Sequence, residues 1–155
     1  MANTSKTAIV TGASRGIGAG LVEAFLKRGY NVVANSRNIT KANPFAAAAN
    51  VALVDGDIGH PGTAAMIVDT AVSRFGRIDV LINNAGVFIP KPFLEYTTED
   101  FNTLVSTTLA GFLYVSQLRA CFENASHSTL TLLYKELGYY RWDGCKRIQL
   151  ITRLT

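Results

Sequence analysis

A glycine-rich segment near the start of the chain, residues 11–18, limits what this sequence can fold into more than any other feature. It reads Thr-Gly-Ala-Ser-Arg-Gly-Ile-Gly and follows residues 7–10, a short β-branched apolar run typical of a buried parallel strand. Apolar residues then recur at helical spacing over residues 17–28, until Gly29 ends the pattern. A strand that turns through glycines into a helix can present backbone N–H groups to a phosphate.

Each glycine of this segment has its own use in such a site. Gly12 would let the chain turn sharply off the strand, Gly16 would let the backbone approach a pyrophosphate, and Gly18 would let the helix pack close to the strand. Glycines alone would also suit an ordinary tight turn. The strand before them and the helix after them favour the dinucleotide-binding interpretation.

Strand and helix patterns alternate along the rest of the chain. Further buried strands are predicted at 31–34, 51–54 and 78–82, and helices at 45–49, at 61–75 and from Thr97 or Thr98 onward. Thr97 or Thr98 would cap the long helix. This alternation implies right-handed parallel units, and therefore an α/β fold of Rossmann type with a doubly wound parallel sheet.

The regular pattern ends after about Cys121. We therefore predict a dinucleotide-binding Rossmann-type domain over residues 1–120 and an atypical C-terminal tail over residues 121–155, without recognisable periodicity from Glu136 onward. The sheet is expected to be truncated after its fourth or fifth strand. In the order 3-2-1-4 the fourth strand is an edge unless residues 129–134 form a fifth strand beside it. An uncovered edge strand favours self-association, so a homo-oligomer is left open.

Two motifs together resemble the short-chain dehydrogenase/reductase family. Residues 11–18 are similar to the cofactor motif of that family, and Asn83-Asn84-Ala85-Gly86, at the end of the fourth predicted strand, is similar to its second signature. The resemblance covers about residues 6–119. It implies descent from an oxidoreductase that acts on carbonyl or alcohol substrates with a nicotinamide cofactor.

The resemblance implies a role for each matching position. The pyrophosphate and the neighbouring ribose would be lined by Gly12, Ser14, Arg15, Ile17 and Gly18. Asp57 and Ile58, after the third strand, would flank the adenine, with Asp55 as the alternative match for Asp57. The ribose on the nicotinamide side would be contacted by Asn84, Ala85 and Gly86. Asn83 would mainly hold neighbouring strands together.

The turn after the second strand indicates which nicotinamide cofactor fits. An acid at this place binds the ribose 2′-hydroxyl of NAD, but residues 35–38 read Asn-Ser-Arg-Asn and contain none. Arg37 would pair with a 2′-phosphate through its guanidinium, and Arg15 adds positive charge on the same side. NADP is therefore favoured over NAD. The alternative is that Arg37 is only a solvent-exposed loop arginine.

The catalytic residues of the family are not recognisable here, so the sequence assigns none. The family uses a tyrosine, a lysine four residues later on the same helix face, a serine and an asparagine. No Tyr-x-x-x-Lys occurs, and the adjacent Tyr134 and Lys135 would point to different faces. Thr108 stands where the family has its asparagine and lacks the paired donor and acceptor of an amide. Whether the chain is an enzyme is left open.

Composition argues against several other classes. A net charge of +4 is a mild excess and no dense basic patch, so no nucleic-acid partner is expected. No apolar run reaches the roughly 18 residues of a membrane helix, and no signal peptide is recognised, so a cytoplasmic location is expected. Cys121, His127 and Cys145 match no zinc pattern, so no metal is expected.

Three functions remain open. The first is an NADP(H)-binding protein of oxidoreductase ancestry whose catalysis is weak or lost. The second is a non-catalytic NADP-sensing or interaction module. The third is a truncated or frameshifted product of such an oxidoreductase, with a tail read in the wrong frame from about Cys121. The substrate cannot be read, because the family recognises it through a C-terminal region that has no match in this chain.

Overall fold

The computed structural model describes residues 5–45, 48–123, 130–134, 138–143 and 147–151, with side chains described as far as Ala120. The strands are β1 (Thr7–Thr11), β2 (Asn31–Ser36), β3 (Val51–Asp55), β4 (Val80–Asn83), β5 (Leu130–Tyr134), β6 (Gly138–Asp143) and β7 (Arg147–Ile151). The helices are α1 (Gly16–Lys27), α2 (Ile39–Ala42), α3 (Pro61–Phe75), α4 (Thr98–Leu104) and α5 (Gly111–Glu123). A 3-10 turn η1 (Phe93–Glu95) precedes α4, and a π-helical segment η2 (Val105–Ala110) joins α4 to α5.

The described strands form one sheet in the order β3-β2-β1-β4-β5-β6-β7. From β3 to β5 every neighbouring pair is parallel, and β6 and β7 are then added in antiparallel pairing. The α/β fold, the order 3-2-1-4 and a fifth strand beside the fourth are therefore confirmed. The two antiparallel strands that follow were not predicted.

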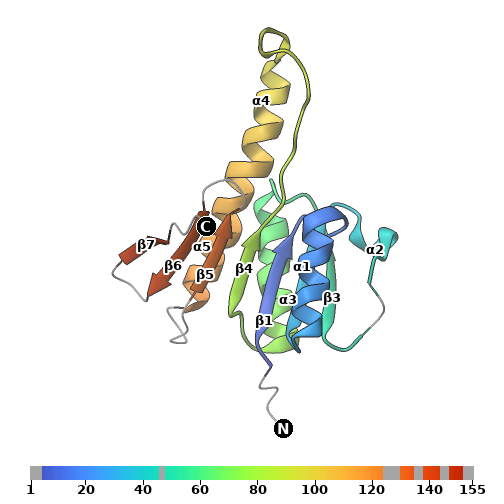
Figure 1. Ribbon diagram of the computed structural model, residues 1–155, viewed down its shortest axis with the longest axis vertical. Helices are drawn as coiled ribbons and strands as arrows, with labels where there is room; N and C mark the ends of the chain where they lie inside the picture. Colours follow the sequence, from blue (N-terminus) through green and yellow to red (C-terminus); the bar gives the residue numbers. More distant parts are fainter. Residues whose placement is uncertain (1–4, 46–47, 124–129, 135–137, 144–146, 152–155) are drawn as a thin grey trace.

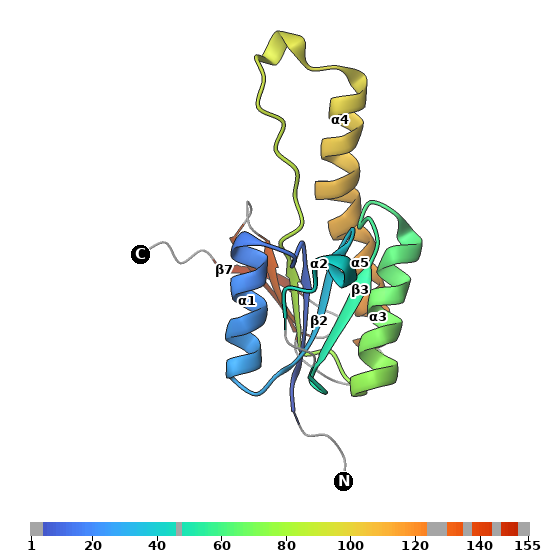
Figure 2. The same cartoon turned by 90° about the vertical axis from the view of Figure 1, so that its right-hand side faces the viewer.

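Helices cover both faces of the sheet, with α1 on one face and α3 and α5 on the other (Figures 1 and 2). One buried cluster joins Val10 of β1 to Val22 of α1. The other joins Ile9 of the same strand to Ile67 of α3 and Val115 of α5. Successive residues of a strand point to opposite faces, so the continuous apolar run of β1 serves both clusters.

The long helix extends beyond the sheet. Segments α4, η2 and α5 follow one another without a break, and α4 projects past the carboxyl ends of the strands together with the chain that leads to it (Figure 2). We call residues 87–104 the arm. Thr97 caps α4: its hydroxyl accepts a hydrogen bond from the Asp100 N–H at 3.2 Å, and its own N–H donates to the Asp100 carboxylate at 2.8 Å. The predicted cap is confirmed as Thr97.

Two local predictions were wrong. The short helix expected at 45–49 is not helical in its described residues, and the helical turn is α2, which lies before Pro44. Asn43 ends α2 with a left-handed φ of 39°, and a residue before proline is disfavoured in the helical region. The alanines after Pro44 lacked both a cap and an apolar face. The fourth strand begins at Val80 rather than Ile78.

Strands β6 and β7 occupy residues for which the sequence predicted no element. In their register, Tyr140 pairs with Leu150 and Trp142 with Ile148, whereas Arg141 pairs with Gln149. The neighbouring pair, Tyr139 with Ile151, is also apolar, so apolar and polar positions do not alternate regularly. The lack of clear periodicity from Glu136 onward is therefore a property of the sequence, and it hid two strands of only five or six residues.

Candidate functional site

A cavity of about 780 Å³ opens at the carboxyl ends of β1 to β4, where the loops after these strands meet. Every residue that the sequence proposed for cofactor binding lines it: Gly12, Ser14, Arg15, Ile17, Gly18, Arg37, Asp57, Ile58, Asn84, Ala85 and Gly86. The remaining lining residues are Gly16, Asn35, Ser36, Asn38, Ala42, Gly56, Val87, Thr103, Ser106 and Thr107. The sheet thus brings together loops that are distant in the chain, as expected at the carboxyl ends of parallel strands.

The glycine loop is shaped by close contacts on one side and open space on the other. A Cβ on Gly12, whose φ is +65°, would lie 2.8 Å from the Ala85 Cα atom. A Cβ on Gly18 would lie 2.6 Å from the Asn84 Nδ2 atom and would collide with the Gly12 carbonyl. At Gly16 a Cβ would meet nothing within 4 Å. The backbone around Gly16 therefore faces the cavity, while Gly12 and Gly18 let β1, α1 and the loop after β4 pack together.

Polar groups tie the loop after β4 to the end of β1. The Asn84 side-chain amide donates to the carbonyls of Thr11 and Gly12 at 3.0 and 3.1 Å. The Thr11 hydroxyl accepts from the backbone N–H groups of Asn84 and Ala85 at 3.1 and 3.0 Å. The tie that was expected of Asn83 is therefore made by Asn84. The Asn83 amide instead donates to the Ser116 hydroxyl of α5 at 3.4 Å.

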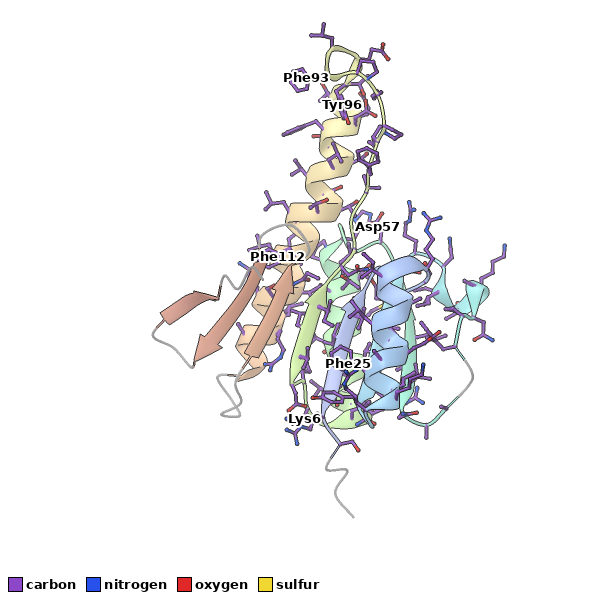
Figure 3. The ribbon with its side chains drawn as sticks, viewed as in Figure 1. Lys6, Phe25, Asp57, Phe93, Tyr96 and Phe112 are labelled. Atoms are coloured by element: carbon purple, nitrogen blue, oxygen red, sulfur yellow. The ribbon has the colours of Figure 1, made fainter. Side chains whose placement is uncertain are left out.

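The structure separates the two acids that the sequence left as alternatives. Asp57 lines the cavity, and its carboxylate accepts a hydrogen bond from the Gly59 N–H at 2.9 Å. Asp55 does not line the cavity and binds Thr40 of α2 instead. The hydrogen bond from the Thr40 hydroxyl, helped by the Thr40 N–H, lowers the pKa of Asp55 below its usual 3.8. Asp57 is thus the acid that a ligand in the cavity would meet (Figure 3).

Two arginines border the cavity from different loops. Arg15 stands at the N-terminus of α1, and Arg37 stands in the turn between β2 and α2. Both side chains are exposed, and both residues line the cavity. The turn after β2 contains Arg37 and no acidic residue, so the electrostatic potential at this rim favours an anion.

The glycine loop and the loop after β4 lie in a segment that matches one known protein family. Residues 6–126 match the family model described as short chain dehydrogenase. The chain belongs to the short chain dehydrogenase family. The resemblance inferred from residues 11–18 and 83–86 is therefore confirmed, and the match continues through the whole of the long helix.

Individual members of the short chain dehydrogenase family match over much of this chain. An uncharacterized oxidoreductase of Methylorubrum extorquens is 36% identical over 119 residues, which are 72% of this chain and 48% of that protein. The solved structure of ElxO with NADP bound has a TM-score of 0.73 at 27% identity, covering 81% of this chain and 53% of that one. A 3-ketoacyl-(acyl-carrier-protein) reductase from Brucella melitensis complexed with NADH has a TM-score of 0.70 at 28% identity, covering 77% and 52%. The chain thus spans about half the length of the relatives it matches.

The helical wall of the cavity was missed by the sequence interpretation. Thr103 of α4 and the η2 residues Ser106 and Thr107 line the cavity, whereas Thr108, which stands at the short chain dehydrogenase asparagine position, does not. A Cβ on Gly59 would lie 3.2 Å from the Ser106 carbonyl, so this wall packs directly on the loop after β3. The spacing of residues 103, 106 and 107 is that of one helix face, and their three hydroxyls were the signal that could have revealed it.

No tyrosine whose side chain the structure describes lines the cavity, where a proton donor would be needed. The tyrosines with described side chains are Tyr30, Tyr96 and Tyr114, and none of them lines the cavity. Tyr96 lies at the tip of the arm (Figure 3). The Tyr134 side chain and Lys135 lie outside the part of the chain whose side chains are described.

Metal and membrane features were searched over the same described part of the chain. There, no group of three or more His, Cys, Asp or Glu residues is arranged to hold a metal ion. The side chains of Cys121, His127 and Cys145 lie outside it. No described helix combines the length and the apolar character needed to cross a bilayer.

Proposed function

We propose that this short chain dehydrogenase binds NADP(H) in the cavity at the carboxyl ends of β1 to β4, and that its oxidoreductase activity on carbonyl or alcohol substrates is weak or lost. One observation carries the proposal: the backbone around Gly16 is open to the cavity, while Gly12 and Gly18 leave no room for a side chain on the packed side. A loop of this shape lets a diphosphate approach the backbone closely.

The N-terminus of α1 fits a diphosphate electrostatically. Arg15 is its cap residue with extended backbone, makes no side-chain capping bond, and is followed by no acid in the first turn. The first N–H groups of a helix have no partner within the helix, and its dipole favours an anion there. A diphosphate placed at Gly16 would supply the missing acceptors.

The preference for NADP over NAD rests on this chain's own side chains. Family members take either cofactor, since ElxO is solved with NADP and the Brucella melitensis reductase with NADH. Here Arg37 lines the cavity where an acid would select NAD, and Arg15 adds a second positive charge. Asp55, the last residue of β3, binds Thr40 outside the cavity wall. A 2′-phosphate would therefore meet guanidinium groups rather than a carboxylate.

Weak or lost catalysis follows from what the cavity offers for proton transfer. A bound nicotinamide supplies or accepts a hydride, and reduction of a carbonyl also needs a proton donor beside the forming alkoxide. Among the described lining residues the titratable groups are Asp57, Arg15 and Arg37. Asp57 is held by the Gly59 N–H at the adenine end proposed for it, and an arginine does not give up its proton near neutral pH. No described side chain is placed to donate that proton.

A second candidate, an interaction module that responds to NADP, is favoured by the arm. Both ends of the arm line the cavity, at Val87 and at Thr103, while Phe93 and Leu94 at its tip are exposed. A ligand between the two ends would contact the segment that presents these apolar side chains. In this candidate the chain binds NADPH as proposed and has no turnover.

The proposal is tested by titrating the purified full chain with NADPH and with NADH and monitoring nicotinamide fluorescence. NADPH should bind saturably and about tenfold more tightly than NADH, because a charge-assisted phosphate–guanidinium contact is strong. Arg37→Ala should remove most of that difference. Arg28→Ala, which removes an equal charge from the far end of α1, is the matched control and should leave it unchanged. Absence of saturable NADPH binding contradicts the proposal, and carbonyl-dependent NADPH oxidation contradicts the loss of catalysis.

A further inference from the structure

Arg37 stands in a short connection between β2 and α2. Strand β2 ends at Ser36 and α2 begins at Ile39, so only Arg37 and Asn38 form the turn between them. Both turn residues line the cavity. The direction in which the turn leaves the sheet therefore decides whether the guanidinium can reach a ligand.

Asp55, at the end of β3, holds both sides of this turn. Its backbone lies beside Ser36 in the register of β2 and β3, and the next residue, Gly56, donates its N–H to the Ser36 carbonyl at 3.1 Å. Its carboxylate lies on the other side of the turn, where it accepts the Thr40 N–H at 2.9 Å and the Thr40 hydroxyl. Asp55 thus connects the residue before the turn to a residue after it.

Helix α2 depends on this carboxylate for its N-terminal cap. Asn38 occupies the cap position but makes no side-chain capping bond. The Asp55 carboxylate takes the Thr40 N–H that such a cap would have taken. Ile39 is fully buried in the α1-side core, so α2 cannot shift without exposing an apolar side chain. Helix α2 is a single short turn at the outer edge of the molecule in Figure 1. It is held from the core side by Ile39 and from the β3 side by Asp55.

We propose that Asp55 and Thr40 form a clamp that positions Arg37 for the 2′-phosphate of NADP, and that this clamp sets the preference for NADP over NAD. The inference rests on the proposed function. Neither Asp55 nor Thr40 lines the cavity, so both are positioning residues that act through the turn. The hydrogen bonds from Thr40 keep the pKa of Asp55 below 3.8, so the carboxylate stays charged and able to accept both bonds at neutral pH.

A purely electrostatic role for Asp55 predicts the opposite sign. A carboxylate close to a bound 2′-phosphate would repel it, so its removal would strengthen NADPH binding. A clamp predicts that removal of Asp55 weakens NADPH binding, because Arg37 loses its fixed position. Thr40→Val separates the two roles further, since it removes the hydroxyl bond without changing any charge.

The experiment measures dissociation constants for NADPH and NADH with the full chain and its variants. Thr40→Val and Asp55→Ala should each weaken NADPH binding about five- to tenfold and change NADH binding by less than about twofold, because only the phosphate contact is lost. Thr40→Ser keeps the hydroxyl and should restore the preference. Thr70→Val, which removes a threonine hydroxyl bonded at 2.6 Å to the Met66 carbonyl within α3, is the matched control and should resemble the unmodified chain.

Failure of the clamp is distinguishable from failure of the proposed function. If Arg37→Ala abolishes the NADPH preference while Thr40→Val and Asp55→Ala leave it intact, the clamp is wrong and the proposed function stands. Stronger NADPH binding by Asp55→Ala also overturns the clamp. Equal losses of NADPH and NADH affinity in Thr40→Val overturn it as well, because they indicate general damage to the cavity.

Discussion

The cavity region, which we define as residues 7–86, and the arm use the same kinds of side chain in opposite ways. Phe75 closes α3 against the sheet with 5% of its surface exposed, whereas Phe93 at the tip of the arm is 88% exposed. Leu81 of β4 is fully buried, whereas Leu94 is 95% exposed. Figure 3 shows Phe93 at the end of the arm, far from the sheet. Apolar side chains are buried in the core of the cavity region and stabilise it, whereas the arm exposes its apolar side chains to solvent.

The arm keeps its shape through polar contacts instead of a core. Lys91 forms an ion pair with Asp100 and lies 5.6 Å from the centre of the Tyr96 ring. The Tyr96 hydroxyl donates to the Ile89 carbonyl at 2.5 Å, and Thr97 and Asp100 form the capping box of α4. Order and burial are therefore separate properties in this chain. The cavity region has both, and the tip of the arm has order without burial.

The largest contrast is expected between two phenylalanines. Phe75→Ala should lower the free energy of unfolding by about 3–5 kcal/mol, because it leaves a cavity in the core. Phe93→Ala should change it by less than about 0.5 kcal/mol, because the ring is already in water. Urea unfolding followed by circular dichroism measures both values. A loss above about 2 kcal/mol for Phe93→Ala would show that the arm packs against something in solution.

A smaller contrast is expected between two buried threonines of β1. The Thr11 hydroxyl accepts two backbone N–H groups of the loop after β4, while no described residue bonds to the Thr7 hydroxyl, and both side chains are at most 1% exposed. Thr11→Val should cost about 1–2 kcal/mol because it leaves two partly buried N–H groups without their acceptor. Thr7→Val should be neutral or stabilise by up to about 1 kcal/mol.

Urea unfolding of the two threonine variants, with an NADPH titration of each, checks this second prediction. Thr11→Val should also weaken NADPH binding, since Asn84 and Ala85 line the cavity. Equal stability of the two variants would mean that the tie between β1 and the loop after β4 contributes nothing to folding.

The smallest effect is expected at Asp100 in the arm. The hydrogen bond from Lys91, followed by those from Thr97, lowers the pKa of Asp100 from 3.8 to about 2. At pH values above 3.8, the pKa of this group in the unfolded chain, the charged carboxylate stabilises the folded arm. This stabilisation is lost as the pH falls toward about 2, the pKa in the folded chain. The Asp100 side chain is partly exposed and its partners Lys91 and Thr97 belong to the arm, so the effect should stay local to the arm.

Hydrogen exchange of residues 97–104 between pH 5 and pH 2.5, scaled for intrinsic exchange, measures this local effect. Protection should fall with pH in the unmodified chain and should be low and nearly independent of pH in Asp100→Asn. Glu99→Gln makes the same change of charge one residue earlier and leaves the capping box intact, so it should behave like the unmodified chain. Protection that is unchanged in Asp100→Asn would contradict a role of the capping box in ordering the arm.

Much of the cavity region was predictable because its signals are local. A β-branched run, the three glycines of the motif at residues 11–18 and a helical spacing lie close together in the sequence, and each has one physical use. The tail was not predictable to the same degree. Strands β6 and β7 are five or six residues long and carry no regular alternation, so they are recognised only when a partner strand fixes their register.

By itself the sequence determined the strand–glycine–helix corner, the parallel sheet, a helix cap at Thr97 or Thr98 and the absence of a Tyr-x-x-x-Lys pair. The tertiary structure alone decided that Asp57 rather than Asp55 lines the cavity, that Asn84 rather than Asn83 ties the strands, and that a helix supplies a wall of hydroxyls. The physical reason is distance along the chain. Dihedral preferences and periodicity act between near neighbours, whereas the partner of a side chain is chosen by segments that meet only when the sheet has formed.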